Sequence, residues 1–178
     1  MLKKSLIIVA CLAIIFSAFI AMQPSEFLVS RSIKITATPA EIFAHVNNQK
    51  KWQAWSPWIK LDPKAEYVFE GPDQGIGSIV KWSGNREIGK GSSEIVESKT
   101  NEFVKFKLVF EEPMKVTDSV DFTFTKQGKE TLVVWTMNGE KNFVAKAFGL
   151  FCNCQEKVGE IFDEGLANLK NVSEKKGK

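Results

Sequence analysis

The middle of the chain, from Leu61 to Asn138, is a series of short segments in which apolar and polar residues alternate. Turn-forming glycine, proline and asparagine residues separate these segments. An alternation of period two places successive side chains on opposite faces of a strand, so each segment is predicted to be a half-buried strand. The predicted strands contain Tyr67 and Phe69 or span residues 79–82, 87–97, 103–110, 116–125 and 131–137. Strands that follow one another this closely are typical of an antiparallel meander.

The segment before this meander is predicted to hold one more strand and two short helices. Residues 27–36 alternate in the same way, which gives about seven strands in total. Thr38, Pro39 and Glu41 then form the pattern of a capping box that begins a helix. A second helix carrying Trp52 and Trp55 must end at Ser56-Pro57, because proline disfavours helical backbone in the residue before it.

The last part of the chain is predicted to be one long helix, from Phe143 to Lys170. Its length of about 42 Å is enough to cross a small domain. The apolar stripe predicted for it contains Val144, Phe148, Phe151, Val158, Phe162 and Leu169. Gly149, Gly159 and Gly165 each cost a helix about 1 kcal/mol relative to alanine. We therefore expect close packing against the sheet, or room for a ligand, at these positions.

The three cysteines do not predict a disulfide framework. Cys11 lies near the N-terminus, and Cys152 and Cys154 fall within the predicted long helix. Residues two apart in a helix point to opposite sides and cannot form a disulfide unless the helix unwinds. His45 is the only histidine, so neither a metal site nor a cofactor is expected, and its position near a helix C-terminus is typical of a surface residue.

The N-terminal segment is predicted to enter a membrane. Lys3 and Lys4 precede an uncharged, largely apolar run from Leu6 to Met22. A spanning helix needs about 17–25 apolar residues, whereas a signal-peptide core needs about 7–15, so the length favours an uncleaved anchor. A cleaved signal and lipidation at Cys11 are the alternatives. The two lysines predict a cytoplasmic N-terminus and a domain on the outer, periplasmic or extracellular, side.

The charge balance argues against a nucleic-acid partner. The whole chain has 24 basic and 21 acidic residues, and without Lys3 and Lys4 the remaining domain has 24 − 2 = 22 against 21. Nucleic-acid-binding domains normally carry a clear positive excess. Residues 173–178 form a short basic tail that is expected to be solvated.

Taken in order, these elements resemble the helix-grip fold of the START-like and Bet v 1-like superfamily (SRPBCC). Within it, the chain resembles the polyketide cyclase/dehydrase and lipid-transport family over about residues 27–170. The motifs that carry the resemblance are Val29-x-Arg31-Ser32-Ile33, Ala37-Thr38-Pro39-Ala40-Glu41-Ile42-Phe43, Trp52-x-x-Trp55-Ser56-Pro57-Trp58 and Gly75-x-Gly77-Ser78-x-x-x-Trp82. The resemblance implies an α+β fold in which a curved antiparallel sheet of about seven strands wraps around a long C-terminal helix. It divides the chain into an anchor or signal segment (1–24), the START-like domain (25–172) and the tail.

The same resemblance implies an apolar cavity between sheet and helix. The ligand-binding residues predicted there are Arg31, Trp58, Trp82, Asp118, Phe122, Trp135, Phe148, Phe151 and Phe162. Arg31 and Asp118 share strand faces with apolar residues, so each must be paired, touch a polar ligand group, or lie at a sheet edge facing water. Trp52, Trp55 and Trp58 are expected to pack over one end of the sheet, with an insertion into the membrane as the alternative.

The expected function is a membrane-anchored domain that binds a hydrophobic or amphipathic small molecule, such as a lipid, in this cavity. One alternative is an enzyme of the cyclase/dehydrase type, for which Arg31 and Asp118 are the candidate ionisable groups. The other is a non-catalytic interaction module with a filled core.

Overall fold

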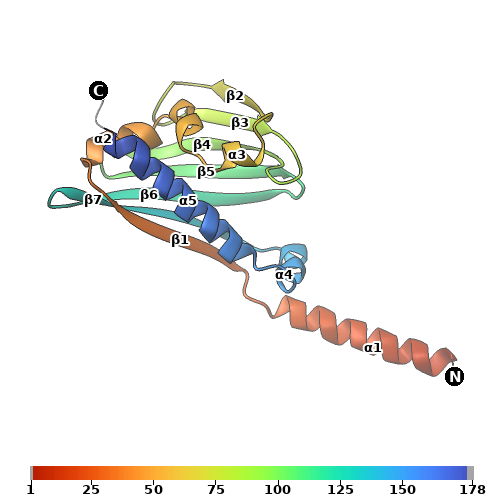
Figure 1. The fold of residues 1–178 in the computed structure, drawn as a ribbon. Coiled ribbons are helices and arrows are strands. Elements are labelled where there is room, and N and C mark those ends of the chain that lie inside the picture. Colours follow the sequence, from red (N-terminus) through yellow and green to blue (C-terminus); the bar gives the residue numbers. More distant parts are fainter. Residues whose placement is uncertain (1, 176–178) are drawn as a thin grey trace.

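The computed structural model describes residues 2–175, which form one curved sheet, a helix lying across it, and an apolar helix that extends away from both (Figure 1). The strands are β1 (Glu26–Ile35), β2 (Glu66–Glu70), β3 (Ile79–Ser83), β4 (Lys90–Lys99), β5 (Phe103–Glu112), β6 (Val116–Gln127) and β7 (Glu130–Glu140). The α-helices are α1 (Leu2–Ala21), α2 (Pro39–Val46), α3 (Trp58–Leu61), α4 (Phe143–Gly149) and α5 (Cys154–Glu174), with a 3-10 helix η1 (Gln49–Ala54).

The sheet is antiparallel throughout, in the order β1-β7-β6-β5-β4-β3-β2. From β2 to β7 each strand pairs with its neighbour in the sequence, and β1 closes the far side by pairing with β7. The predicted seven-stranded meander is confirmed. The strand alternation sets which side chains face inward, because one residue of shift would move the whole apolar set to the other face.

The segment between β1 and β2 closes one end of the sheet with short helices. The capping box of α2 forms as predicted: the backbone N–H of Glu41 donates to the Thr38 hydroxyl, and the backbone N–H of Thr38 donates to the Glu41 carboxylate. The tryptophan segment is a 3-10 helix that ends before Pro57, and a second short helix, α3, follows at once. α3 was not predicted, since it holds a single turn.

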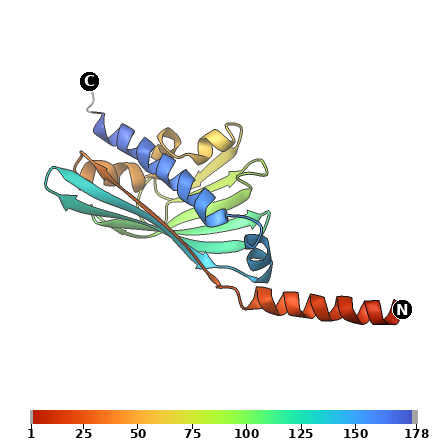
Figure 2. The ribbon, with the colours of Figure 1, turned by 60° about the horizontal axis from the view of Figure 1, so that its bottom comes forward.

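Helix α5 runs diagonally over the inner face of the sheet (Figure 2). Phe162, Leu166 and Leu169 on its buried side are each no more than 1% exposed and join the same apolar core as the inward residues of the strands. Its buried glycines allow close contact: a Cβ at Gly159 would collide with the Arg31 guanidinium, and one at Gly165 would lie 2.6 Å from the Trp135 ring. Close packing therefore offsets the helix-propensity cost at these two positions.

The prediction of one continuous helix from Phe143 to Lys170 was wrong. The chain forms α4, leaves the helical path after Gly149, and begins α5 at Cys154. Cys152 and Cys154 are bonded as a disulfide across this break, with their Cα atoms 5.2 Å apart, so the expectation that they do not bridge was also wrong. The reason is that the helix does unwind here, since glycine is a poor helix former and the bonded pair requires non-helical backbone.

Helix α1 is separate from the sheet. Residues 3–21 are long and apolar enough to cross a membrane. Among the side chains described for α1 only Ile20 is buried, at the end nearest the domain. At the other terminus, α5 continues to Glu174, two residues beyond the expected domain end at 172; residues 176–178 of the tail lie outside the described residues.

Candidate ligand-binding site

A cavity of about 180 Å³ lies on the inner face of the sheet, between the central strands, the tryptophan segment and the first half of α5. Its walls are mainly aromatic and aliphatic. The aromatic lining residues are Trp52, Trp58, Tyr67, Trp82, Phe106, Phe110, Trp135 and Phe162, and the aliphatic ones are Ile59, Val80, Ile88, Leu108, Val120, Met137 and Val158. The polar lining residues are Gln49, Gln53, Ser56, Glu87 and Ser93.

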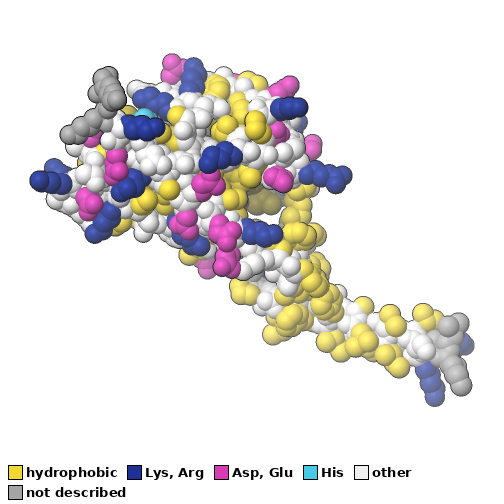
Figure 3. All heavy atoms as spheres, in the orientation of Figure 1, with side chains coloured by type: hydrophobic (Ala, Val, Ile, Leu, Met, Phe, Trp, Pro, Cys, Tyr) yellow, Lys and Arg dark blue, Asp and Glu magenta, His cyan; other side chains and the backbone are white. Residues whose placement is uncertain are grey.

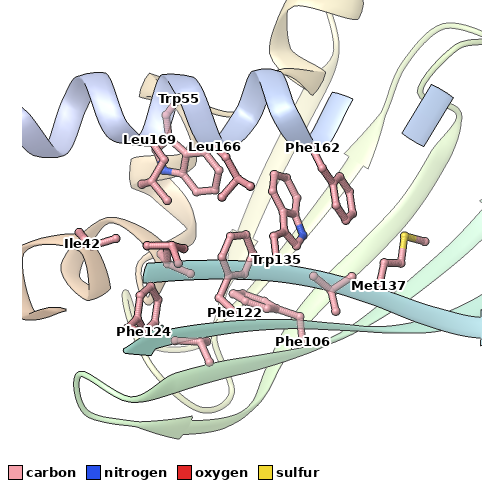
Figure 4. Packing of buried hydrophobic residues seen from close by; sticks show 14 of the residues in the cluster. Ile42, Trp55, Phe106, Phe122, Phe124, Trp135, Met137, Phe162, Leu166 and Leu169 are labelled. Atoms are coloured by element: carbon pink, nitrogen blue, oxygen red, sulfur yellow. The ribbon is translucent and has the colours of Figure 1, made fainter. Parts of the chain in front are cut away.

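Trp135 and Phe162 form the part of the wall that joins β7 to α5. Their rings are stacked, with centroids 3.9 Å apart and planes 9° apart (Figure 4). Phe122 lies against Trp135 at 4.7 Å but is fully buried and does not line the cavity. This arrangement leaves few alternative rotamers for the three rings, so the wall is preorganised.

The tryptophan segment closes the cavity at the end of the sheet near α2. The Trp52 indole donates to the Val46 carbonyl at 2.9 Å, and the Trp55 indole donates to the His45 carbonyl at 3.4 Å. Trp55 is buried in the core, while Trp52 and Trp58 line the cavity. Each indole thus has a buried apolar ring and a satisfied N–H, which explains how so much aromatic surface is held in one short segment.

Trp82 is held on the far side of the cavity by its own strand and the following turn. Its indole N–H donates to the Ile88 carbonyl at 3.0 Å, and its ring packs edge-on against Phe110. Gly91 on the neighbouring strand makes room for the ring, since a Cβ there would lie 2.6 Å from Trp82.

Three polar groups at or next to the cavity have unused hydrogen-bonding capacity. Gln49, which is 3% exposed, donates from Nε2 to the carbonyls of Ser78 (2.7 Å) and Ser93 (3.2 Å), and its Oε1 has no partner among residues 2–175. Nε1 of Trp135, also deeply buried, likewise has none among these residues. Burial raises the pKa of the Tyr67 hydroxyl, and the nearby Asp62 raises it further. A neutral, hydrogen-bonding ligand group therefore suits this site better than an anion.

Arg31 lies on β1 outside the cavity lining. Its Nε donates to the Asp163 carboxylate of α5 at 3.1 Å and its Nη1 to the Ser30 carbonyl at 2.9 Å. Both side chains of the ion pair are partly exposed, so the pair fastens the edge of the sheet to the helix but contributes little stability, about 0–1 kcal/mol.

Asp118 also lies outside the cavity, in a shallower depression at the end of β6 and β7. It is paired across the sheet with Leu108 and Gly139, and a Cβ at Gly139 would collide with its carboxylate. The residue is 7% exposed, and no described residue donates a hydrogen bond to it. Burial without a partner raises its pKa to about 6.

Phe148 and Phe151 are not near this wall. The break before α5 places them on the outside of the domain, where they are 61% and 83% exposed. Of the nine predicted residues, Trp58, Trp82, Trp135 and Phe162 are brought together around the cavity.

Sequence reasoning missed several lining residues, including Gln49, Tyr67, Ile88 and Phe110. Alternation placed Phe106, Leu108 and Phe110 on one face of a strand, but it could not show that this face is the inner one. Gln49 gave no signal, because its burial depends on carbonyls from two distant strands. His45, expected at the surface, is half-buried; burial and the nearby Lys51 lower its pKa, and it does not line the cavity.

A curved antiparallel sheet, a long helix across its inner face and an apolar cavity between them define a helix-grip domain of the Bet v 1-like class. Similar folds occur in solved structures, each of which has a low sequence identity to this chain. The Aha1 dimer of Colwellia psychrerythraea is 17% identical, with a TM-score of 0.60, covering 85% of this chain and 99% of that one. The ginseng (Panax ginseng) major latex-like protein 151 is 13% identical, with a TM-score of 0.56, covering 85% and 99%.

The family is identified by sequence. The profile of the family described as polyketide cyclase / dehydrase and lipid transport matches residues 26–174. This chain belongs to that family. A comparison with curated proteins found no significant match.

Proposed function

We propose that this protein is a membrane-anchored domain that binds a hydrophobic or amphipathic small molecule in the cavity between the sheet and α5. The observation that carries the proposal is the cavity itself: an apolar space of about 180 Å³ is left within an otherwise close-packed core. Cores are normally filled to the density of organic crystals, so a space of this size requires an explanation.

The volume limits what the cavity holds as it stands. An apolar cavity of about 150 Å³ accommodates a benzene-sized molecule, whereas pockets for whole drug-sized ligands span roughly 300–1,000 Å³. The occupant is therefore a one-ring compound, a short apolar chain, or the end of a longer acyl chain whose remainder leaves through the open side.

The polar groups favour an amphipathic ligand over a hydrocarbon. Gln49 supplies an unused acceptor in the wall, and the Tyr67 hydroxyl stays neutral at physiological pH. A ligand hydroxyl or carbonyl could pair with them without burying a charge.

Anchoring by α1 is the second part of the proposal. The helix is about as long as the hydrocarbon core of a bilayer is thick, and its apolar side chains are exposed in the described structure. Lys3 and Lys4 favour a cytoplasmic N-terminus with the domain on the outer side. A cleaved signal sequence would share these features and would release the same domain.

The test is a variant that fills the cavity. Val158 lines it from α5, and Val158→Trp would occupy much of its volume. We expect native mass spectrometry of the full-length protein, released from detergent, to show a bound mass that is absent from this variant. Val68→Trp is the matched control, because Val68 is 54% exposed on β2 and does not line the cavity.

The pair of variants separates a cavity ligand from lipid attached to α1. Lipid on the anchor would remain in all three proteins, whereas a cavity ligand would disappear only with Val158→Trp. Equal bound masses in the wild type and both variants, or no bound mass after incubation with a lipid extract, would contradict the proposal and favour the interaction module.

A cyclase/dehydrase-type enzyme has less support. That alternative relied on Arg31 and Asp118 meeting in the cavity, but Arg31 pairs with Asp163 and Asp118 lies beyond the lining.

A further inference from the structure

An apolar surface lies where α4 meets the end of α1. Outside α1, the exposed large apolar residues of this part of the chain are Met22, Phe143, Val144, Phe148, Leu150 and Phe151. With 100° per residue, Phe143, Val144 and Phe148 fall within an arc of about 140° on α4, so one side of this helix is apolar. Figure 3 shows the apolar surface continuing from α1 onto the domain.

An exposed cluster of this kind requires a partner. Soluble proteins rarely expose contiguous apolar patches beyond a few hundred Å², and larger ones mark interaction sites. Burial inside the domain is excluded by the structure: α4 starts directly after β7 and the disulfide Cys152–Cys154 holds the turn that follows it, so Phe148 and Phe151 face outward.

The position of α4 relative to α1 identifies the partner. The Lys146 ammonium donates to the Ala21 carbonyl at 3.2 Å, and this carbonyl is at the C-terminal end of α1. A helix of α1's length reaches from one side of the hydrocarbon core to the other, so its last residue lies at the interface between hydrocarbon and headgroups. Whatever holds α1 in a bilayer therefore holds α4 at the bilayer surface.

We propose that α4 and the Leu150–Phe151 turn are a second membrane contact, inserted into the interface of the lipid bilayer that α1 spans. Its composition suits this role: aromatic and aliphatic residues form the apolar side, the segment from Phe143 to Phe151 has no acidic residue, and Lys146 can reach headgroup phosphates. The inference rests on the proposed anchoring by α1 and adds an orientation to it.

Two contacts fix the domain where one would leave it free to rotate. A single helix followed by the short Met22–Ser25 linker would allow the domain to tumble above the membrane. Docking of α4 holds the start of α5 close to the bilayer, and Val158, one turn into α5, lines the cavity. The hollow visible in Figure 3 lies on the same side as the apolar surface, so a ligand could pass between cavity and membrane over a short path.

Site-specific photocrosslinking tests the contact. The full chain is reconstituted in vesicles of phosphatidylcholine and phosphatidylglycerol with p-benzoylphenylalanine at one position at a time. The position tested is Phe148, where the probe replaces an exposed ring by a similar one. Ile14 within α1 is the positive control, and Val68, equally exposed but on β2, is the negative control. We expect lipid adducts at Phe148 and Ile14 at roughly tenfold the yield at Val68, since the probe reacts with the C–H bonds of acyl chains that water does not reach.

The outcomes are distinguishable. Lipid adducts at Ile14 without adducts at Phe148 would overturn the inference and leave the anchor intact. Crosslinking of Phe148 to a second copy of the chain would overturn it in favour of a dimer. Absence of lipid adducts at Ile14 would remove the anchor and the inference together, while ligand binding in the cavity, measured with Val158→Trp, would be unaffected.

Discussion

Asp118 shows how much a single inward-facing residue depends on its surroundings. Its strand position predicted an inward charge, and the structure buries the carboxyl beside Gly139 with no donor from the described residues. Desolvation disfavours the charged form, which is why the pKa rises to about 6 from the ordinary 3.8. The carboxyl is thus mostly ionised at neutral pH and mostly protonated in mild acid.

This shift predicts a pH-dependent cost of folding. Because the folded-state pKa is above that of the unfolded chain, the protonated carboxyl favours the folded state below about pH 4, and this contribution is lost as the pH rises through 6. Asp118→Asn removes the titration. We expect the free energy of unfolding of this variant, relative to wild type, to rise by about 1–2 kcal/mol from pH 4 to pH 7.5. Urea titrations followed by tryptophan fluorescence at each pH measure the difference.

The matched control is Asp73→Asn, at an exposed carboxylate that accepts from Lys50 at 2.6 Å. An exposed ion pair contributes about 0–1 kcal/mol, so this variant should stay close to wild type at all pH values. A constant offset between Asp118→Asn and wild type over the whole pH range would show that the carboxyl is not desolvated.

At the scale of elements, the glycines of the C-terminal helices separate two roles that look alike in the sequence. Gly165 lies in contact distance of Trp135 and Pro57, whereas no atom lies within 4 Å of a Cβ built at Gly149. The sequence predicted that each helical glycine needs either tight packing or space. Only the packing of α5 against β7 decides which glycine has which.

Matched Gly→Ala substitutions test this assignment. Gly165→Ala gains helix propensity of about 1 kcal/mol but forces the Trp135 ring or Pro57 to move, so we expect a net destabilisation of about 1–3 kcal/mol. Gly149→Ala should leave stability unchanged or raise it by a few tenths of a kcal/mol. Thermal unfolding of both variants, monitored by near-UV circular dichroism, measures the contrast. An equal effect at the two positions would show that α5 does not lie as close to the sheet as described.

The strands were predicted almost to the residue, and the C-terminal helix was not. Strand alternation is a local signal, repeated over 5 to 12 residues, and the sheet preserves it. The apolar stripe from Val144 to Leu169 is also regular, but it serves two surfaces: its second half packs on the sheet and its first half is exposed. Periodicity cannot distinguish an apolar face that is buried in the protein from one that is not.

On the scale of the whole molecule, the domain and α1 are separate units. Apart from Ile20, the buried apolar residues of the described structure belong to residues 29–169. The family profile begins at residue 26, immediately after the linker. The core therefore does not depend on the helix that precedes it.

Removal of residues 1–24 should leave the fold intact. We expect the shortened chain to melt within about 2–4 °C of the full chain, because only the contacts of α1 with α4 are lost. Differential scanning calorimetry of the shortened chain and of the full chain in detergent makes the comparison. A large loss of stability, or a failure of the shortened chain to fold, would show that α1 is part of the core.

The sequence alone determined the class of fold, the number and order of strands, the capping box at Thr38 and the apolar N-terminal helix, because each depends on residues close together in the chain. Only the tertiary structure decided which aromatic rings line a cavity, which charged groups lie outside it, and that the helical stripe divides at Cys152–Cys154. These features arise from contacts between segments up to about a hundred residues apart, such as Arg31 with Asp163 and Trp52 with Trp135. A periodic pattern shows that a face is apolar, but the partner that covers that face is a property of the folded molecule.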